Sequence, residues 1–296
     1  MKQYYSVAGI AELCGLFGKS RQAFYDNNWR QQDQQLHDGL ILDMVRELRR
    51  LMSKLGGIKL HRMLKEPLAA HGISIGRDSL FTLLRDNDLL IKTKKRYTRT
   101  TFSNHPYKKW PSLINELQVT APEQLWVSDI TYLRTACQFI YLSLITDAYS
   151  RKIVGYHLSQ FLKAQGCIIA LNKAIASLAA APQGNLTHHS DRGIQYCCEP
   201  YVTILQSHKI NISMTQTGSP YDNAIAERVN GILKTELGLG QVFETYASAV
   251  AYLPGAIDTY NRLRPHMSCG YLTPEQAHYK KGPLETKWKN VKKHLL

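Results

Sequence analysis

Residues 125–133 have the sequence LWVSDITYL, in which a single acidic residue, Asp129, lies among β-branched and aromatic residues. Such residues are enriched in β-strands. Two further runs of the same kind follow closely, FIYLSLITD at 139–147 and KIVGYHL at 152–158. Because the connections are too short for a crossover helix, we predict that these three strands pair antiparallel.

From residue 163 onward the pattern alternates between helix and strand. We predict a helix over 163–179, a short strand at 186–189 that leads into Asp191, a helix over about 199–208, a strand at 212–215 and a long helix that starts near Tyr221. Three antiparallel strands followed by helix, strand, helix, strand and helix resemble the element order of an α/β ribonuclease-H-like core. We therefore expect a mixed five-stranded sheet with helices over residues 121–240.

Three carboxylates fall on elements that can aim them at one point. Asp129 lies within a predicted strand, Asp191 follows the end of another strand, and Glu227 lies on the long helix. Two-metal phosphodiester chemistry needs hard oxygen ligands that converge from different elements on ions about 3.5–4 Å apart. The three acids are therefore candidate ligands and catalytic residues.

The helix that carries Glu227 repeats polar side chains at helical spacing. Its polar residues are Asn223, Glu227, Asn230 and Lys234. At about 100° per residue these four share one narrow face, and the apolar Ile225, Val229 and Ile232 lie opposite. The alternative is an ordinary amphipathic helix whose polar face is solvated.

Residues 1–90 have helical patterns with turn signals between them. Gly18 and Ser20 separate two helical runs, with Gly18 suited to the turn and Ser20 to the cap of the next helix. An amphipathic helix is predicted over 39–55, and Gly72 and Gly76 punctuate a second pair of helices. These units resemble helix-turn-helix DNA-binding units, with a plain helical hairpin as the alternative.

A basic linker is predicted over residues 91–120. Residues 91–110 hold no acid but seven cations: Lys92, Lys94, Lys95, Arg96, Arg99, Lys108 and Lys109. Aromatic residues are interleaved with them, which suits contact with a phosphate backbone, although a solvated linker has the same composition. The formal net charge of +14 favours the DNA interpretation, and we select Lys94, Lys95 and Arg96 as candidate contacts.

Other candidate sites are weaker. No 18-residue apolar run or signal-like start is present, so we expect no membrane contact and a cytoplasmic location. The six cysteines lack zinc-ligand spacing, and His188 and His189 are adjacent on a strand and point to opposite faces. Asp147 is a rival carboxylate, but its position at the end of a strand favours a turn-initiating role.

The spacing of the three acids is that of a known pattern. Sixty-one residues separate Asp129 from Asp191, 35 separate Asp191 from Glu227, and Lys234 lies seven residues after Glu227. The local words are WVSDITY at 126–132, HSDRGIQY at 189–196, GSPYDNAIAE at 218–227, YNRLRPH at 260–266 and GYLTPE at 270–275. Together they resemble the D,D(35)E pattern of retroviral-type integrases and, over about residues 40–280, the second-frame protein (OrfB) of the large bacterial insertion-sequence family numbered three.

The resemblance implies a DNA transposase that cleaves one strand at an element end and joins the freed 3′-hydroxyl to DNA, by way of a circular intermediate. It implies a triad of Asp129, Asp191 and Glu227 that holds two Mg²⁺ ions, with Mn²⁺ able to substitute. It also implies that Lys234 contacts DNA near the cleaved end. The further candidate DNA-binding residues near this site are Arg228, Asn223 and Gln195.

The resemblance also sets the expected partners. These are the terminal inverted repeats of the element, target DNA and further copies of the chain on that DNA. A first-frame (OrfA) protein is a further partner, either separate or as a fusion.

Beyond residue 240 we expect a C-terminal helical extension and basic tail over 241–296. Two alternatives remain: a hydrolytic nuclease of the same fold, and a non-catalytic DNA-binding regulator.

Overall fold

The computed structural model describes residues 9–91, 106–114, 117–216 and 223–285. The chain forms two compact units, one made of Met1–Arg50 and Gly56–Ile91 and the other of Leu51–Leu55 and Lys92–Leu296. Among the described residues, no helix is both long enough and apolar enough to cross a bilayer.

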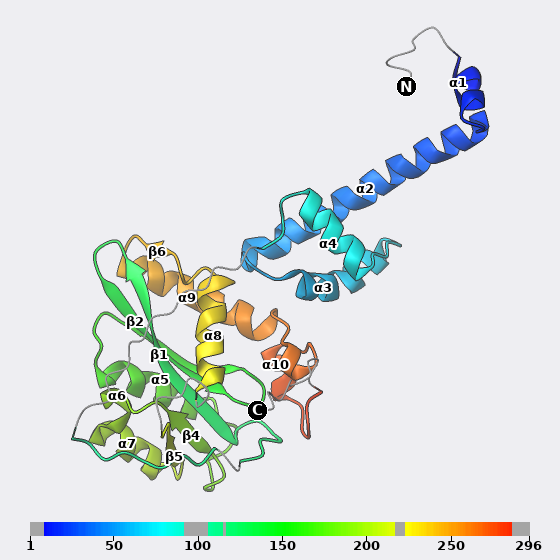
Figure 1. The fold of residues 1–296 in the computed structure, drawn as a ribbon. Helices are drawn as coiled ribbons and strands as arrows, with labels where there is room; N and C mark the ends of the chain where they lie inside the picture. Colours follow the sequence, from blue (N-terminus) through cyan, green and yellow to red (C-terminus); the bar gives the residue numbers. More distant parts are fainter. Residues whose placement is uncertain (1–8, 92–105, 115–116, 217–222, 286–296) are drawn as a thin grey trace, which may run out of the picture. The chain divides into compact units, whose positions relative to one another are not determined.

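The first unit is helical, with α1 (Ile10–Leu16), α2 (Arg21–Leu51), α3 (Gly57–Ala70) and α4 (Arg77–Asp86) (Figure 1). The predicted turn is present: Gly18 has φ 63°, a left-handed conformation that glycine adopts without strain. Ser20 Oγ accepts a hydrogen bond from the Ala23 amide at 3.0 Å, as a helix cap does.

Helix α2 is longer than the sequence indicated. It is one continuous helix of 31 residues, where we expected separate helical runs around residues 21–25 and 39–55. The polar stretch between those runs has no apolar period to detect. Polar pairs four residues apart span this part of the helix, and Gln22 and Gln34 donate to Asp26 and Asp38 at 2.9 and 2.8 Å.

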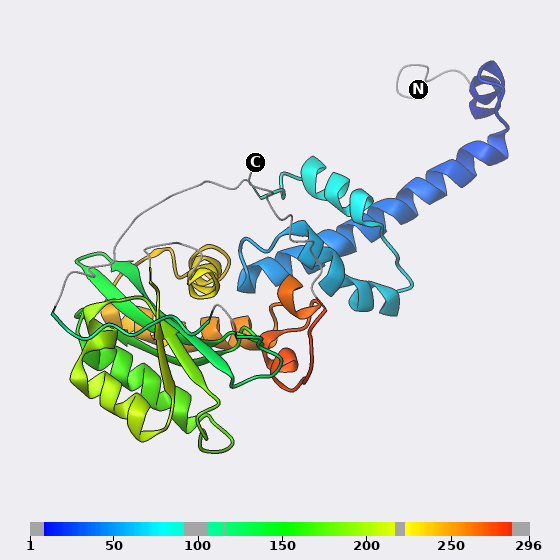
Figure 2. The ribbon, with the colours of Figure 1, turned by 60° about the horizontal axis from the view of Figure 1, so that its bottom comes forward.

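Helices α3 and α4 form the predicted helical pair. Leu60, Leu64 and Leu68 recur every four residues on the buried side of α3, and Leu80 and Leu84 do the same on α4. Both helices lie against the C-terminal half of α2 (Figure 2).

The second unit is built on a mixed sheet. Its main strands are β1 (Leu125–Thr135), β2 (Phe139–Asp147), β3 (Ile153–Ser159), β4 (Thr187–Ser190) and β5 (Asn211–Met214), in the order β3-β2-β1-β4-β5. As predicted, β1, β2 and β3 pair antiparallel, while β4 pairs parallel with both β1 and β5. The expected count of five needs correction, because β6 (Val242–Phe243) pairs parallel with the end of β1. A two-residue strand has no alternation that sequence could reveal.

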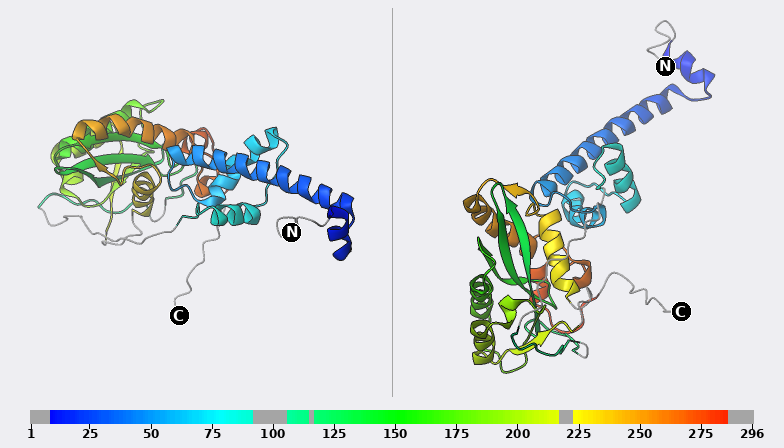
Figure 3. Two further views of the ribbon diagram at one scale, coloured as in Figure 1. Left: turned by 90° about the horizontal axis from the view of Figure 1, so that it is seen from above. Right: turned by 60° about the vertical axis from the view of Figure 1, so that its left-hand side comes forward.

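Helices cover both faces of the sheet (Figure 3, right). On one face, α5 (Ala164–Ala176), α6 (Ile194–Cys197) and α7 (Glu199–Ser207) enclose the larger core, with Trp126 fully buried in it. On the other face, α8 (Ala224–Thr235) packs through Ala226 onto Leu125 and Val127. Neighbouring residues of β1 therefore face different helices, as strand alternation requires.

The last part of the unit comprises α9 (Tyr246–Arg262), a 3-10 helix at Met267–Cys269 and α10 (Pro274–His278). The Asn261 amide accepts from the Ile153 N–H at 2.9 Å and donates to the carbonyl of Ile153 at 3.0 Å. Arg264, 1% exposed, makes two 2.8 Å contacts with the Glu236 carboxylate. These residues fix the C-terminal segment to the sheet and to the end of α8.

Candidate active site

The sheet register brings Asp129 beside Asp191. Strands β1 and β4 run parallel, with Val127 opposite His189. This is the last pair of the ladder, and the same register continued by two residues would bring Asp129 opposite Asp191, which directly follows β4. Neighbouring strands lie about 4.8 Å apart, so two carboxylates leave the sheet next to each other. Asp129 shares the face of Val127, the face covered by α8.

Asp129 is half-buried and has two hydrogen-bond donors. Its Oδ1 accepts from the amide of Ile130 at 2.9 Å, and its Oδ2 accepts from Nδ2 of Asn230 at 2.7 Å. Burial raises the pKa of Asp129 to about 7, repulsion from Asp191 and Glu227 adds to the increase, and the two hydrogen bonds oppose it. A cation placed here would relieve this repulsion.

Asp191 is held by the turn that follows it. The amide of Gly193 donates to Asp191 Oδ1 at 3.0 Å. A Cβ added at Gly193 would lie 2.9 Å from that same oxygen, closer than van der Waals contact allows. Glycine at this position therefore leaves room for the carboxylate, and any other side chain would displace it.

Helix α8 does not expose its whole polar face. Asn223 and Asn230 are buried, at 8% and 6% exposure, so the interpretation of a solvated amphipathic helix is wrong. Nδ2 of Asn223 donates to the backbone carbonyl of Ser128 at 3.0 Å, and Asn230 donates to Asp129. Both asparagines therefore fasten α8 to β1 beside the carboxylates.

Glu227 and Lys234 lie at the rim of this contact. Glu227 is exposed, and partial desolvation raises its pKa. Lys234 is half-buried, and burial lowers its pKa while the attraction of Asp129 opposes that change. The helix thus brings one acid and one base to the edge of the pair formed by Asp129 and Asp191.

The donor set suits a hard divalent cation. In the side-chain positions of the described residues, no three acidic, histidine or cysteine side chains are grouped closely enough to hold a metal ion. Asp129 nevertheless interacts electrostatically with both Asp191 and Glu227, and Glu227 is exposed. In addition, Oδ1 of Asn223 and Oδ1 of Asn230 are buried without hydrogen-bond partners. Carboxylate and amide oxygens are the ligands that Mg²⁺ accepts.

A buried network of polar side chains, which the sequence did not predict, lies on the face of β1 opposite Asp129. Nε2 of His188 is 2.6 Å from Oγ of Ser128 and 2.9 Å from the hydroxyl of Tyr201, and all three residues are buried. Burial and the neighbouring His189 lower the pKa of His188 to about 3, so the ring is neutral. Strand alternation could have indicated which side of the sheet His188 faces. It could not have indicated the contact with Tyr201, which comes from α7.

The remaining residues that the sequence singled out lie either in the second unit or outside the described residues. Arg228 is exposed on α8, and Nε2 of Gln195 is 3.5 Å from the carbonyl of Leu162. Lys94, Lys95 and Arg96 lie outside the described residues. Asp147 caps a turn, as predicted, by accepting hydrogen bonds from the amide and hydroxyl of Ser150 at 2.8 Å each.

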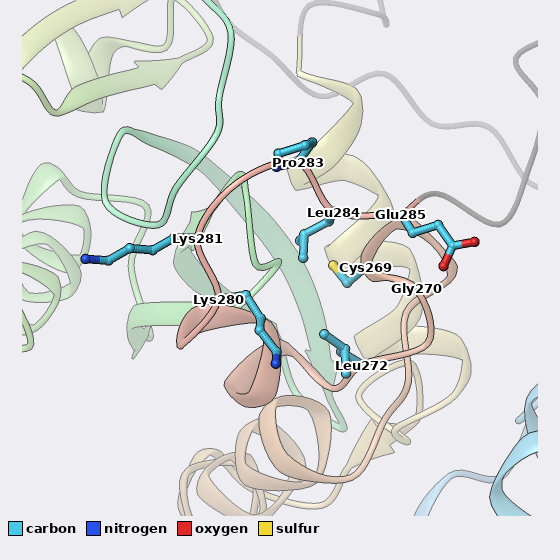
Figure 4. A pocket seen from close by; sticks show the side chains of 8 residues that line it. All are labelled: Cys269, Gly270, Leu272, Lys280, Lys281, Pro283, Leu284 and Glu285. Atoms are coloured by element: carbon cyan, nitrogen blue, oxygen red, sulfur yellow. The ribbon is translucent and has the colours of Figure 1, made fainter.

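A pocket of about 290 Å³ lies elsewhere in the same unit (Figure 4). Its lining comes from the segment after α9 and comprises Cys269, Gly270, Leu272, Lys280, Lys281, Pro283, Leu284 and Glu285. It contains none of the predicted site residues.

Comparisons with known proteins identify the family of the chain. Residues 119–220 match an integrase core domain model, and residues 208–274 match a second model of the same description. The chain is 35% identical to an uncharacterized 31 kDa protein of insertion element IS600 from Shigella sonnei, over 88% of the chain and 96% of that protein. It is 33% identical to the transposase InsF for insertion sequence IS3A from Escherichia coli K12, over 72% of the chain and 74% of that transposase.

Solved structures with related folds include the HTLV-2 integrase catalytic core domain in complex with magnesium. The TM-score is 0.44 at 20% identity, covering 54% of the chain and 98% of that domain. A simian T-cell lymphotropic virus intasome gives a TM-score of 0.47 at 21% identity, over 80% and 79% of the two chains. The two sequence relatives and the integrase core models show that the chain belongs to the transposases of the IS3 insertion-sequence family, polynucleotidyl transferases of the retroviral-integrase-like superfamily with a ribonuclease-H-like core.

Proposed function

We propose that Asp129, Asp191 and Glu227 are the catalytic carboxylates of this transposase and that they hold two divalent ions, Mg²⁺ or in its place Mn²⁺. The observation that carries the proposal is the parallel β1–β4 pairing, whose register leads to Asp129 and Asp191, together with the charges of Asp191 and Glu227 that both act on the Asp129 carboxyl group. The substrate is DNA at the ends of an insertion sequence, and the freed 3′-hydroxyl is joined to a second strand.

The chain's own residues prepare this site. Bound ions would activate the attacking oxygen and stabilise the leaving oxygen. Asn230 holds Oδ2 of Asp129, and the Gly193 amide holds Oδ1 of Asp191, so both carboxylates are oriented before DNA arrives. The exposed Glu227 completes the set from the rim.

The test uses Asp129→Asn, Asp191→Asn and Glu227→Gln with DNA that carries the element's ends, and Mg²⁺. Because the three groups act as a unit, each substitution should lower strand cleavage about a thousandfold or more. Glu244→Gln, which changes an exposed acid of the same unit, is the matched control. Normal cleavage by any triad variant would exclude that residue, and cleavage without joined strands would indicate a hydrolytic nuclease.

We propose that Lys234, Arg228 and Gln195 contact DNA near the cut. Lys234 is a half-buried cation beside the carboxylates, and Arg228 is exposed on the same helix. Lys234→Ala should weaken binding to DNA ends while the melting temperature changes little, and unchanged binding would refute the contact. Asn223 is buried, so its contribution would pass through the Ser128 carbonyl.

We propose that two further regions bind DNA outside the core. These are the helical region of residues 1–90 and the basic linker of residues 91–120, which contains Lys94, Lys95 and Arg96. Two element ends must be held together, so the protein is expected to assemble as a homo-oligomer on DNA in the bacterial cytoplasm. An OrfA protein is a further proposed partner. Sedimentation of the full chain with and without paired end DNA tests the assembly, and a monomer on paired ends would contradict it.

A further inference from the structure

A cluster of aromatic side chains extends from the strand that carries Asp129. Tyr132 lies three residues after Asp129 on β1, and it pairs across the hairpin with Tyr141 on β2. Their ring centroids are 5.1 Å apart at an interplanar angle of 71°. Phe139 adds a third ring 6.2 Å from Tyr132, also edge to face. We call Tyr132, Phe139 and Tyr141 the hairpin rings.

The hairpin rings are not covered by helix α5. Ser143 of β2 contacts Cys167 in the first turn of α5, with Oγ and Sγ 3.4 Å apart. Tyr141 and Phe139 lie two and four residues before Ser143 on β2, toward the tip of the hairpin and past the N-terminal end of α5. Phe139 is accordingly 51% exposed, and the two tyrosines are half-buried.

A cation accompanies the rings. Arg134 is opposite Phe139 in the hairpin, and its guanidinium carbon lies 5.5 Å from the Phe139 ring centroid. Arg134 is itself exposed. The surface therefore combines π faces with a positive charge, the combination that binds single-stranded nucleic acid through base stacking and phosphate contact.

Tyr132 follows Asp129 by three residues on β1, roughly 10 Å along the strand, and side-chain alternation places it on the opposite face of that strand. Burial and the neighbouring Tyr141 raise the pKa of Tyr132, and the charges of Asp129 and Asp191 raise it further. The Tyr132 hydroxyl thus lies within the electrostatic reach of both acids. In the part of the chain that the structure describes, β1 has no pairing strand on the β4 side between Val127 and Arg134, where β6 begins to pair, so a DNA strand bound at those acids could pass this edge to reach the hairpin rings.

We propose that the hairpin rings and Arg134 form a stacking site for unpaired bases of the DNA strand that is cut or joined at Asp129 and Asp191. Only an unpaired or unstacked base exposes its face to a ring, so this site favours frayed over fully paired DNA. The inference rests on the proposed function for its location, but stacking itself needs neither metal nor an active triad.

The test measures binding of the full chain, without divalent metal, to three probes that each contain 2-aminopurine. The probes are a single-stranded oligonucleotide, a duplex with a mismatched end and the same duplex fully paired. Stacking should change the fluorescence of the first two probes. The double variant Phe139→Leu/Tyr141→Leu should bind them about tenfold more weakly, equivalent to ~1.4 kcal/mol, and should bind the paired duplex as the wild type does.

Two further positions distinguish the loss of a stacking ring from the loss of a hydroxyl group or of any exposed aromatic side chain. Tyr132→Phe keeps the ring and should bind like the wild type, whereas Tyr132→Leu should not. Tyr279→Leu removes a ring that is 78% exposed outside the hairpin, and it should leave all three affinities unchanged. If the double variant does not fold, the single Phe139→Leu variant, which changes the most exposed of the hairpin rings, replaces it.

The outcomes differ for the two proposals. Equal binding of all probes by folded ring variants and the wild type would overturn the stacking site. An Asp129→Asn protein that cleaves DNA normally would overturn the triad, yet it would leave the binding results intact.

Discussion

Asp129 should make the metal-free protein less stable as the pH rises. Its pKa is about 7 in the folded protein, compared with 3.8 as the ordinary value, so the folded state binds this proton more tightly than the unfolded state does. The resulting stabilisation is fully present below about pH 4 and is lost as the pH rises through about 7. Asparagine at this position is neutral at every pH and keeps the stabilisation.

The size of the effect follows from the shift and from exposure. A difference between 3.8 and about 7 corresponds to at most ~4 kcal/mol. Because the side chain is only half-buried, solvent screens part of this energy, and we expect about 1–2 kcal/mol at pH 8. For a unit of this size that equals a rise in melting temperature of roughly 2–8 °C for Asp129→Asn in EDTA.

The assay is thermal unfolding of the wild type, Asp129→Asn and the Glu244→Gln control in EDTA from pH 5.5 to 8.5. The melting temperature of Asp129→Asn minus that of the wild type should increase with pH, whereas the difference for Glu244→Gln should stay constant. Adding Mg²⁺ at pH 8 should stabilise the wild type more than Asp129→Asn, because cation and proton compete for the same carboxylates. A difference that does not vary with pH would refute the electrostatic account of the site.

Three further substitutions test the surroundings of the carboxylates. Asn230→Ala removes the amide that donates to Asp129, and strand cleavage should fall about 10- to 100-fold, the effect of losing one charge-assisted hydrogen bond; an unchanged rate would contradict this positioning role. Gly193→Ala places a methyl group against the Asp191 carboxylate and should reduce cleavage at least about tenfold with little change in melting temperature, since its backbone suits any residue. Arg264→Met removes the guanidinium that contacts the buried Glu236 carboxylate and should cost about 3–5 kcal/mol in urea unfolding, and a loss under about 1 kcal/mol would argue against the buried ion pair.

Local patterns predicted the elements of the core because its strands and helices have strong periods. The alternation in β1 predicted which residues share a face, and the parallel pairing with β4 has a register that leads to the two aspartates. Sequence spacing predicts the same acids as candidate ligands, and their catalytic role stays a prediction. The sequence did not predict side-chain contacts between residues that lie far apart along the chain.

Asn230 illustrates the difference. Its spacing from Glu227 placed it on the right face of the helix, but only the tilt of α8 against β1 shows that this face is buried and that the amide meets Asp129. Tyr201 is similar, since its contact with His188 depends on where α7 packs. The predicted length of helix α2 was wrong for a different reason, because the polar middle of the helix has no apolar period.

The site combines a destabilising arrangement with rigid support. Asp129 and Asp191 repel each other, and burial strengthens the repulsion, so these carboxylates would separate unless the surrounding structure fixed them. Three contacts do so from different elements: Asn223 joins α8 to the carbonyl of Ser128, Asn230 holds Asp129, and the Gly193 amide holds Asp191. None of these contacts neutralises a charge. Bound cations would relieve the repulsion between Asp129 and Asp191. We therefore expect metal binding to raise the stability of the protein most strongly above pH 7.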